Sequence, residues 1–244
     1  MPHKPSIQHL HNQVALVTGS TRGIGLAIAQ ALAAEGCNLA ITGRDEKSLS
    51  RISRELASAK IKVLARPCDV RDPQSIDDLF RAIRKKFKRL DILINNAGIA
   101  HANLSVDKLP LPLWQDVIET NLTGTFLLTQ AALPIMKRGG TIVNNLSIAA
   151  NRVFAGSAAY VASKHGALGL TNTLREELRP KGIRVIALLP GATNTDIWNS
   201  FWPGAPRKKM MSPATVAAAV ANAILLPPNA TVETLEVLPT TGLL

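Results

Sequence analysis

The sequence predicts an α/β fold in which helices cover both faces of a doubly wound parallel sheet. Short apolar runs rich in β-branched residues alternate along the chain with longer segments whose apolar residues recur at helical spacing. A glycine-rich loop joins the first of these runs to the first helical segment. With 244 residues, 46% of them hydrophobic, the chain has the size of one such domain. We expect a single domain over residues 13–244, preceded by a flexible tail of residues 1–12.

The first strand and helix enclose a loop suited to binding phosphate. An apolar run at residues 14–18 stops at Gly19-Ser20-Thr21-Arg22-Gly23-Ile24-Gly25, and helical spacing follows until Gly36. Glycines at such a junction let backbone amides approach a pyrophosphate closely, and the helix N-terminus favours its negative charge. The strand before this loop and the helix after it strengthen the prediction of a dinucleotide site.

The remaining elements continue the alternation. Further strands are expected at residues 38–42, 61–65, 90–94, 141–146, 183–189 and 235–238. Helices are expected at residues 73–87, at about 113–136, around Tyr160 to about residue 178, and after Ser212-Pro213, which suit a cap and a first turn. Residues 194–212 hold three aromatic residues, two prolines and a basic run, so we expect a loop or short helices that form a mobile lid.

Three polar residues stand out in the small and apolar segment from Asn145 to Lys164: Ser147, Tyr160 and Lys164. Tyr160 is the only tyrosine in the chain, and Lys164 follows it by one helical turn. A lysine ammonium beside a phenol lowers the phenol pKa, which would let Tyr160 exchange a proton near neutral pH. Ser147 follows a predicted buried strand, where its hydroxyl suits polarisation of a substrate oxygen. The alternative is an ordinary amphipathic helix face, and only a cofactor site elsewhere in the chain favours the catalytic interpretation.

Composition narrows the function classes. The net charge is +11, but the densest basic cluster, residues 85–89, closes a predicted helix, where cations complement the helix dipole. Aromatic residues do not interleave with the basic ones as a nucleic-acid platform would need, so we expect no nucleic-acid partner. Residues 216–226, the longest apolar run, are too few to span a bilayer, and no signal-peptide pattern begins the chain, so we expect a cytoplasmic protein without a membrane partner. Cys37 and Cys68 form no metal or disulfide pattern, and we expect free buried thiols and no metal.

Taken together, these features resemble the short-chain dehydrogenase/reductase family over about residues 13–239. The matching residues are the glycine loop Thr18 to Gly25, Asp69, Asn95-Asn96-Ala97-Gly98, Asn121, Ser147, Tyr160, Lys164 and Pro190-Gly191. The resemblance implies a single-domain Rossmann-type fold, a doubly wound parallel sheet flanked by helices on both faces. It also implies an NAD(P)-binding catalytic domain that transfers hydride between a nicotinamide and a carbonyl or alcohol substrate.

The same resemblance implies a role for each matching residue. Tyr160 is then the general acid in reduction or the base in oxidation, and Ser147 holds the substrate oxygen. Lys164 lowers the tyrosine pKa and binds the nicotinamide ribose, and Asn121 holds a water that links Lys164 to solvent. The implied cofactor-binding residues are Gly19, Ser20, Thr21, Arg22, Gly23, Ile24, Gly25, Arg44, Asp69, Val70, Asn96, Ala97, Gly98, Tyr160, Lys164, Pro190, Gly191 and Thr193.

Charges after the second strand favour NADP over NAD. That strand ends at Gly43-Arg44, and Arg22 lies in the glycine loop, so arginines are available to grip a 2′-phosphate. Asp45 stands about where the general rule places the carboxylate of an NAD enzyme. In the family that acid usually stands where Gly43 is, so we interpret Asp45 as the cap of the following helix.

Several alternatives stay open at this point. The leading prediction is an NADP(H)-dependent ketone reductase or secondary-alcohol dehydrogenase. A 3-oxoacyl carrier-protein reductase would suit the basic surface, but the chain lacks the Val-Asp-Gly-Gly ending common in those enzymes. A catalytically idle dinucleotide-binding scaffold would usually have lost Tyr160 or Lys164. By resemblance we also expect a homodimer or homotetramer, packed through the long helix and the Tyr160 helix.

The substrate is not readable from sequence. Five residues suggest an apolar pocket wall or, alternatively, only the buried side of a lid: Val153, Phe154, Trp198, Phe201 and Trp202. Arg152 and the run Arg207-Lys208-Lys209 would suit an anionic substrate, although exposed loop cations are commoner.

Overall fold

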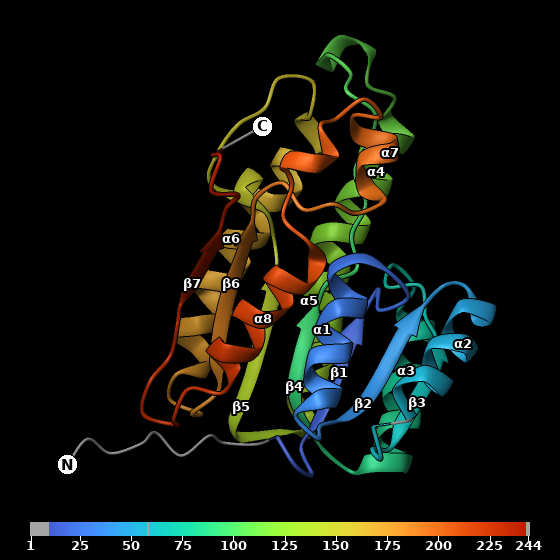
Figure 1. Cartoon of the computed structure of the whole chain (residues 1–244), viewed down its shortest axis with the longest axis vertical. Helices are drawn as coiled ribbons and strands as arrows, with labels where there is room; N and C mark the ends of the chain where they lie inside the picture. Colours follow the sequence, from blue (N-terminus) through green and yellow to red (C-terminus); the bar gives the residue numbers. More distant parts are fainter. Residues whose placement is uncertain (1–9, 58, 243–244) are drawn as a thin grey trace.

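Seven parallel strands form one sheet in the computed structural model, which describes residues 10–57 and 59–242. The strand order is β3-β2-β1-β4-β5-β6-β7 (Figure 1). Successive strands are added on one side of β1 up to β3 and then on its other side from β4 onward, so the order of addition reverses between β1 and β4. In such sheets ligands bind at the carboxyl ends of the strands on either side of the reversal. The strands are β1 (Val14–Thr18), β2 (Asn38–Gly43), β3 (Val63–Pro67), β4 (Leu90–Asn95), β5 (Met136–Asn145), β6 (Arg184–Pro190) and β7 (Thr234–Val237).

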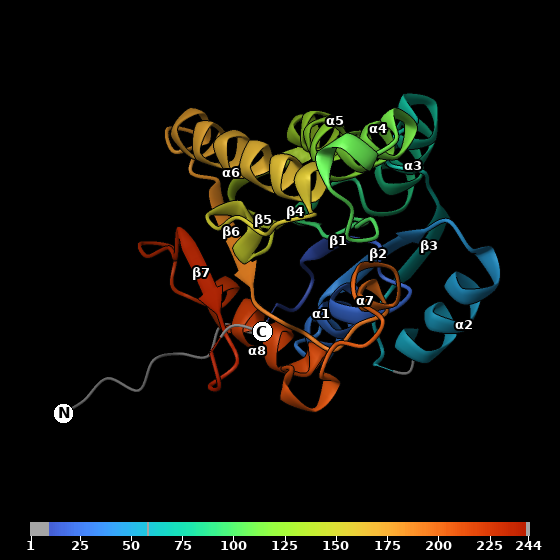
Figure 2. The same cartoon turned by 90° about the horizontal axis from the view of Figure 1, so that it is seen from above.

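Helices cover both faces of this sheet, as the sequence predicted. Seen from above, α1, α2 and α8 lie on one side, and α3, α4, α5 and α6 lie on the other (Figure 2). The helices are α1 (Gly23–Ala34), α2 (Glu46–Ala57), α3 (Pro73–Phe87), α4 (Leu111–Ile118), α5 (Gly124–Ala132), α6 (Ala158–Leu178), α7 (Ile197–Phe201) and α8 (Pro213–Ile224). No helix in the described part of the chain is both long and apolar enough to cross a membrane.

The sheet divides the interior into two large cores. Successive residues of a strand point to opposite faces, so Ala15 and Val17 of β1 pack with α1 and α8, whereas Val14 and Leu16 pack with α3, α5 and α6. Burial on both faces explains why the central strands read as continuous apolar runs rather than as alternating patterns.

Local capping signals place several helix ends where the sequence predicted them. The Ser212 hydroxyl accepts from the backbone N–H of Thr215 at 3.1 Å, and Pro213 begins α8. The Asp45 carboxylate accepts from the backbone N–H of Ser48 at 2.9 Å, which confirms its interpretation as a cap of α2. Helix α3 ends at Phe87 with three basic residues in its last turn, as expected for the cluster at residues 85–89.

The predicted helix at residues 113–136 is wrong in detail. Helix α4 ends at Ile118, a π-helical turn spans Glu119–Thr123, and α5 follows. Met136 already belongs to β5, which begins five residues before the predicted start of that strand at residue 141. Strand β3 begins at Val63 rather than at residue 61. Residues 133–136 continue the apolar spacing of a helix, but partner strand β4 pairs with Met136 and overrides that local signal.

The expected lid at residues 194–212 consists of short helices. It contains α7 and a 3₁₀ turn at Arg207–Lys209. An isolated parallel bridge between Thr193 and Met211 joins the two ends of the segment. The backbone N–H of Asn194 donates to Met211 at 2.9 Å, and the N–H of Met211 donates to Ala192 at 3.0 Å. The lid therefore projects from a closed base beside the carboxyl end of β6.

The core includes a residue that precedes the predicted domain boundary at residue 13. Leu10 is 2% exposed and packs in the core that contains α1 and α8. Its backbone N–H donates to the Glu35 carbonyl at 3.1 Å. The expectation of a flexible tail is therefore wrong for Leu10, because an apolar side chain there fills the end of the core, and the expectation for residues 1–9 lies outside the described residues.

Candidate active site

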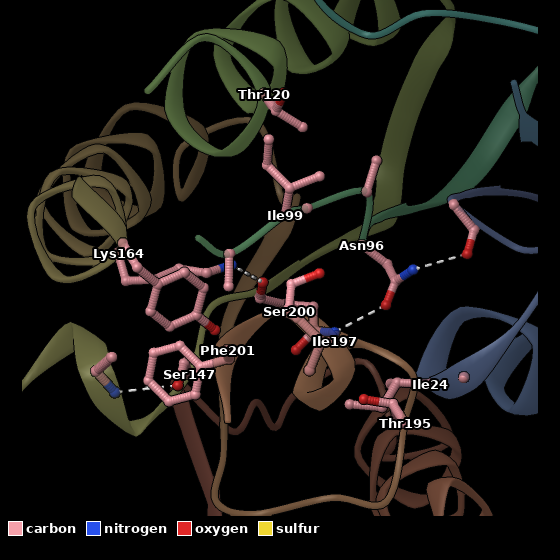
Figure 3. A pocket seen from close by; sticks show the side chains of 18 of the residues that line it. Ile24, Asn96, Ile99, Thr120, Ser147, Lys164, Thr195, Ile197, Ser200 and Phe201 are labelled. Atoms are coloured by element: carbon pink, nitrogen blue, oxygen red, sulfur yellow. Dashed lines mark hydrogen bonds between the residues drawn. The ribbon is translucent and has the colours of Figure 1, made fainter. Parts of the chain in front are cut away.

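Ser147, Tyr160 and Lys164 line one cavity of about 820 Å³ at the carboxyl edge of the sheet. Ser147 lies two residues after the end of β5, and its Oγ accepts from the backbone N–H of Ala149 at 3.1 Å. Tyr160 and Lys164 lie one turn apart on α6, with the lysine Nζ 5.6 Å from the centre of the tyrosine ring. Figure 3 shows Ser147, Lys164 and Phe201 on one side of the cavity. The structure thus brings the three residues together from two elements.

Burial, rather than the lysine charge, dominates the ionisation of this group. Burial raises the pKa of Tyr160 above its ordinary value, and the neighbouring Ser147 hydroxyl offsets only part of that rise. The expectation that Lys164 lowers the pKa of Tyr160 is therefore not met in the protein alone. Lys164 is 5% exposed, and burial lowers its own pKa from 10.5 to about 8. Its Nζ donates to the carbonyl of Asn145 at 3.1 Å.

Asn121 lies behind the cavity wall and ties three segments together. Its Oδ1 accepts from the backbone N–H of Ile99 at 2.9 Å, and its Nδ2 donates to the Ile99 carbonyl at 2.9 Å. The same Nδ2 donates to the hydroxyl of Ser163 on α6 at 3.0 Å. The π-helical turn that contains Asn121 orients this side chain, and such turns recur near functional sites. Both N–H groups of this side-chain amide are therefore engaged within the protein.

The glycine loop is built for close approach of backbone groups. Gly19 has a φ of +61°, and a Cβ there would lie 3.0 Å from the Cα of Ala97, so only glycine fits without strain. The Thr18 hydroxyl accepts from the backbone N–H groups of Asn96 and Ala97 at 2.9 and 3.0 Å. The Asn96 amide donates to the Thr18 carbonyl at 2.8 Å. These bonds fix the loop after β1 against the loop after β4.

Nearly all predicted binding residues line the cavity. The lining includes Gly19, Thr21, Arg22, Gly23, Ile24, Arg44, Asp69, Val70, Asn96, Ala97, Gly98, Pro190, Gly191 and Thr193. Ser20 and Gly25 do not line it. The Ser20 hydroxyl donates to the Thr42 carbonyl at 3.2 Å, and a Cβ on Gly25 would lie 2.4 Å from the Gly19 carbonyl oxygen, so both residues shape the loop from behind.

Arg71 is a cavity residue that the sequence analysis did not identify. Its guanidinium grips both carboxylate oxygens of Asp69, with the closest contact at 2.7 Å, and reaches Asp116 of α4 at 2.8 Å. This pairing lowers the pKa of Asp69, and Arg44 adds to the effect. The position of Arg71, two residues after Asp69, could have indicated their pairing from sequence. Asp116 is 45 residues away from Arg71, and only folding brings the two together.

Asn145 is a second cavity residue that was missed as a site residue. The Nδ2 of Asn96 donates to the Thr18 and Gly19 carbonyls, so the Oδ1 of Asn96 faces Asn145 and accepts from its Nδ2 at 2.8 Å. With the Lys164 bond to its carbonyl, Asn145 links the loop after β4 to α6. The end of β5 thereby positions Lys164 as well as Ser147.

Comparison with known proteins gives the family of this fold and site. A family model described as short chain dehydrogenase matches residues 13–205. A putative ketoacyl reductase of Streptomyces coelicolor is 36% identical, with 95% of this chain and 96% of the relative covered.

Two solved structures agree with that match. An alcohol dehydrogenase of the archaeon Thermococcus sibiricus, complexed with 5-hydroxy-NADP, is 31% identical and superposes with a TM-score of 0.87 over 93% of this chain and 97% of that one. A short-chain dehydrogenase of Burkholderia cenocepacia, in complex with NADP, is 32% identical with a TM-score of 0.88 over 96% of this chain and 99% of that one.

Proposed function

This chain belongs to the short-chain dehydrogenase/reductase family, and from that membership we propose that it is an NADP(H)-dependent reductase of ketones that also oxidises the matching secondary alcohols. The observation that carries the proposal is the convergence of Ser147, Tyr160 and Lys164 on the cavity that the glycine loop also lines. A hydride donor or acceptor and a proton-exchanging phenol are the two parts that such a reaction requires.

The residues present fit NADP(H). Arg44 and Arg22 line the cavity, and the Arg44 side chain forms no hydrogen bond or ion pair with another described residue. The Asp45 carboxylate is engaged as the cap of α2. The acid of an NAD enzyme usually stands where Gly43 is, and a Cβ there would lie 3.0 Å from the Thr21 side chain, so this position is packed as glycine. Both solved relatives described above carry NADP or a derivative of it. When bound, the cofactor supplies the hydride in reduction or accepts it in oxidation.

Tyr160 acts as the general acid in the direction of reduction. Its raised pKa keeps the phenol protonated at neutral pH, which is the form that donates a proton to a carbonyl oxygen as that oxygen gains charge. The Ser147 hydroxyl holds the same oxygen, because it lies at the cavity wall and its Oγ is oriented by the Ala149 N–H.

Lys164 restores the proton and holds the cofactor ribose. With a pKa of about 8 the ammonium loses and regains a proton close to neutral pH. Asn121 positions Ile99 and α6 around this lysine. A water held next to Asn121 would connect Lys164 to solvent. A bound ribose that drew the Lys164 ammonium closer to the phenol would lower the pKa of Tyr160. The phenolate could then act as the base in the oxidation direction.

NADPH oxidation with a panel of ketones tests the proposal. We expect turnover with NADPH to exceed turnover with NADH, and Tyr160→Phe to lower kcat by about 100-fold or more. The affinity of Tyr160→Phe for NADPH, followed by cofactor fluorescence, should stay within about twofold of wild type. Undiminished turnover in this variant would refute the role of Tyr160. Tight NADPH binding without turnover on any ketone would favour the idle scaffold instead.

A carrier-protein reductase is the second candidate, because the Streptomyces relative carries the description of a ketoacyl reductase. An acyl thioester turned over much faster than any simple ketone would favour it. The absent Val-Asp-Gly-Gly ending argues against it.

A further inference from the structure

Aromatic side chains of the lid form one wall of the cavity. Trp198 lies edge-on to Phe201, with ring centres 5.6 Å apart, and its centre lies 6.3 Å from that of Trp202. The indole N–H of Trp198 donates to the Thr193 carbonyl at 2.8 Å, which anchors the ring and satisfies its polar atom. All three rings line the cavity, so the lid presents hydrocarbon surface to a ligand.

This aromatic wall begins beside the reacting group. The centre of the Phe201 ring lies 6.0 Å from the centre of the Tyr160 ring, at an interplanar angle of 47°. Figure 3 shows the Phe201 ring on the same side of the cavity as Ser147, away from Ile24 and Thr195. A carbonyl held by Ser147 and Tyr160 therefore has its remaining framework against Phe201.

The segment after Ser147 forms an apolar counterpart to the lid. Ile148, Val153 and Phe154 line the same cavity. Val153 is 79% exposed and Trp202 is 46% exposed, although both line the cavity. Apolar side chains that stay exposed beside a cavity gain most from a ligand that covers them.

The loop cations that would suit an anionic substrate are engaged elsewhere. Arg152 pairs with Glu236 at 3.2 Å, and Arg207 donates to the Asn199 side chain at 2.8 Å. Neither of them lines the cavity, and neither do Lys208 and Lys209. Arg22 does line it, but pairs with Asp196 of the lid at 3.4 Å. Burying an unpaired carboxylate against the aromatic wall would be costly, so a neutral substrate is favoured.

We propose that the substrate is a neutral ketone on a bulky hydrocarbon framework, such as a fused-ring or aryl ketone, and that Phe201 determines this specificity. The inference rests on the proposed reductase function. In the reaction the carbonyl carbon receives hydride from NADPH and the oxygen receives a proton from Tyr160, which yields the secondary alcohol and NADP⁺.

Kinetics with matched substrates test the specificity. With NADPH, we expect kcat/KM for 2-tetralone to exceed the values for butanone and for acetoacetate by about 10-fold or more. Phe201→Ala should lower kcat/KM for 2-tetralone by about 10- to 100-fold, mainly through KM, and change that for butanone by less than about threefold. Lys208→Ala is the control, because it alters the same lid at an exposed residue that does not line the cavity, and it should leave the ratio between the two substrates unchanged.

Direct binding gives a readout independent of turnover. Of the three tryptophans, Trp198 and Trp202 line the cavity. Trp114→Phe therefore leaves only tryptophan emission from the lid, and Tyr160→Phe in the same chain prevents turnover during the measurement. We expect saturable changes of tryptophan emission with 2-tetralone in the presence of NADP⁺, and none with acetoacetate at the same concentrations.

The outcomes separate the two proposals. Butanone, acetoacetate or an acyl N-acetylcysteamine thioester turned over as well as 2-tetralone would overturn the substrate class and leave the reductase function standing. Equal losses on all substrates in Phe201→Ala would overturn the role of that residue. Saturable binding of 2-tetralone without turnover on any ketone would refute the reductase function and retain the ligand class.

Discussion

At the scale of single residues, two electrostatic effects compete at Lys164 and Tyr160, and desolvation prevails. A positive charge 5.6 Å from an aromatic ring centre favours a phenolate, but Lys164 is itself buried and its pKa falls to about 8. A fully charged ammonium in this place is costly to the folded protein. The buried Lys164 therefore lowers the free energy of unfolding, and the proposed catalytic role explains why a lysine stands there despite this cost.

Lys164→Met should abolish ketone reduction and stabilise the protein. The fall in pKa from 10.5 to about 8 corresponds to about 3 kcal/mol at pH 7, and the lost bond to the Asn145 carbonyl returns about 1 kcal/mol, so we expect a net gain of about 2 kcal/mol. Because the folded pKa lies below the unfolded one, wild type is penalised fully below pH 8. It regains stability as the pH rises to 10.5, so the advantage of the variant should shrink over that window.

Urea denaturation at pH 7 and pH 10 measures this difference. Lys208→Met, at an exposed position of the lid, is the matched control and should change the free energy of unfolding by less than about 0.5 kcal/mol. A variant at Lys164 that is less stable than wild type at pH 7 would contradict the argument.

At the scale of elements, the π-helical turn at Glu119–Thr123 decides where one side chain points. A turn with one extra residue rotates Asn121 toward Ile99 and Ser163. The start of α5 then packs closely on the segment after β3, since a Cβ on Gly124 would lie 2.9 Å from the Val70 side chain. The turn thereby joins the loop after β4 to α6 beneath the proposed catalytic residues.

Asn121→Ala should destabilise the protein by about 3 kcal/mol. The substitution removes three side-chain hydrogen bonds and leaves the backbone N–H and carbonyl of the half-buried Ile99 without their side-chain partner. Asn172→Ala, at an exposed position of α6, should cost less than about 1 kcal/mol. Urea midpoints of the two variants make the comparison, and similar midpoints would show that the Asn121 bonds contribute little.

At the scale of the whole molecule, assembly, location and the boundaries of a single catalytic domain stay predictions. Helix α6, the Tyr160 helix that we expected at a subunit interface, uses several of its small residues within the chain: Ala159 and Ser163 are buried, and a Cβ on Gly166 would lie 2.9 Å from the Leu122 side chain. Phe126 of α5 is 45% exposed and offers an apolar contact on the long helical region instead.

We expect a homodimer or homotetramer in solution, and Phe126→Asp should shift the mass toward 26.1 kDa, the mass of one chain. A charge placed in an apolar interface is left without a partner, which weakens association. Light scattering after size exclusion measures the mass. Val106→Asp, at an exposed position outside those helices, should leave the mass unchanged. A wild-type mass of 26.1 kDa would contradict the expected assembly.

The sequence by itself determined the features that depend on near neighbours in the chain. The glycine loop, the caps Asp45 and Ser212, the strand runs and the Tyr160–Lys164 spacing could all be predicted, because turn chemistry and helical period act over a few residues. The motifs also predicted which residues gather at the sheet edge, since parallel strands end at a common edge.

Only the tertiary structure decided the properties that depend on distant partners. Burial by other elements sets the pKa values of Tyr160 and Lys164, and Arg71 reaches Asp116 only after β3 and α4 have packed. The same holds for Arg152, whose charge is engaged by Glu236 at the far end of the chain. Desolvation and ion pairing depend on three-dimensional distance, which no local pattern encodes.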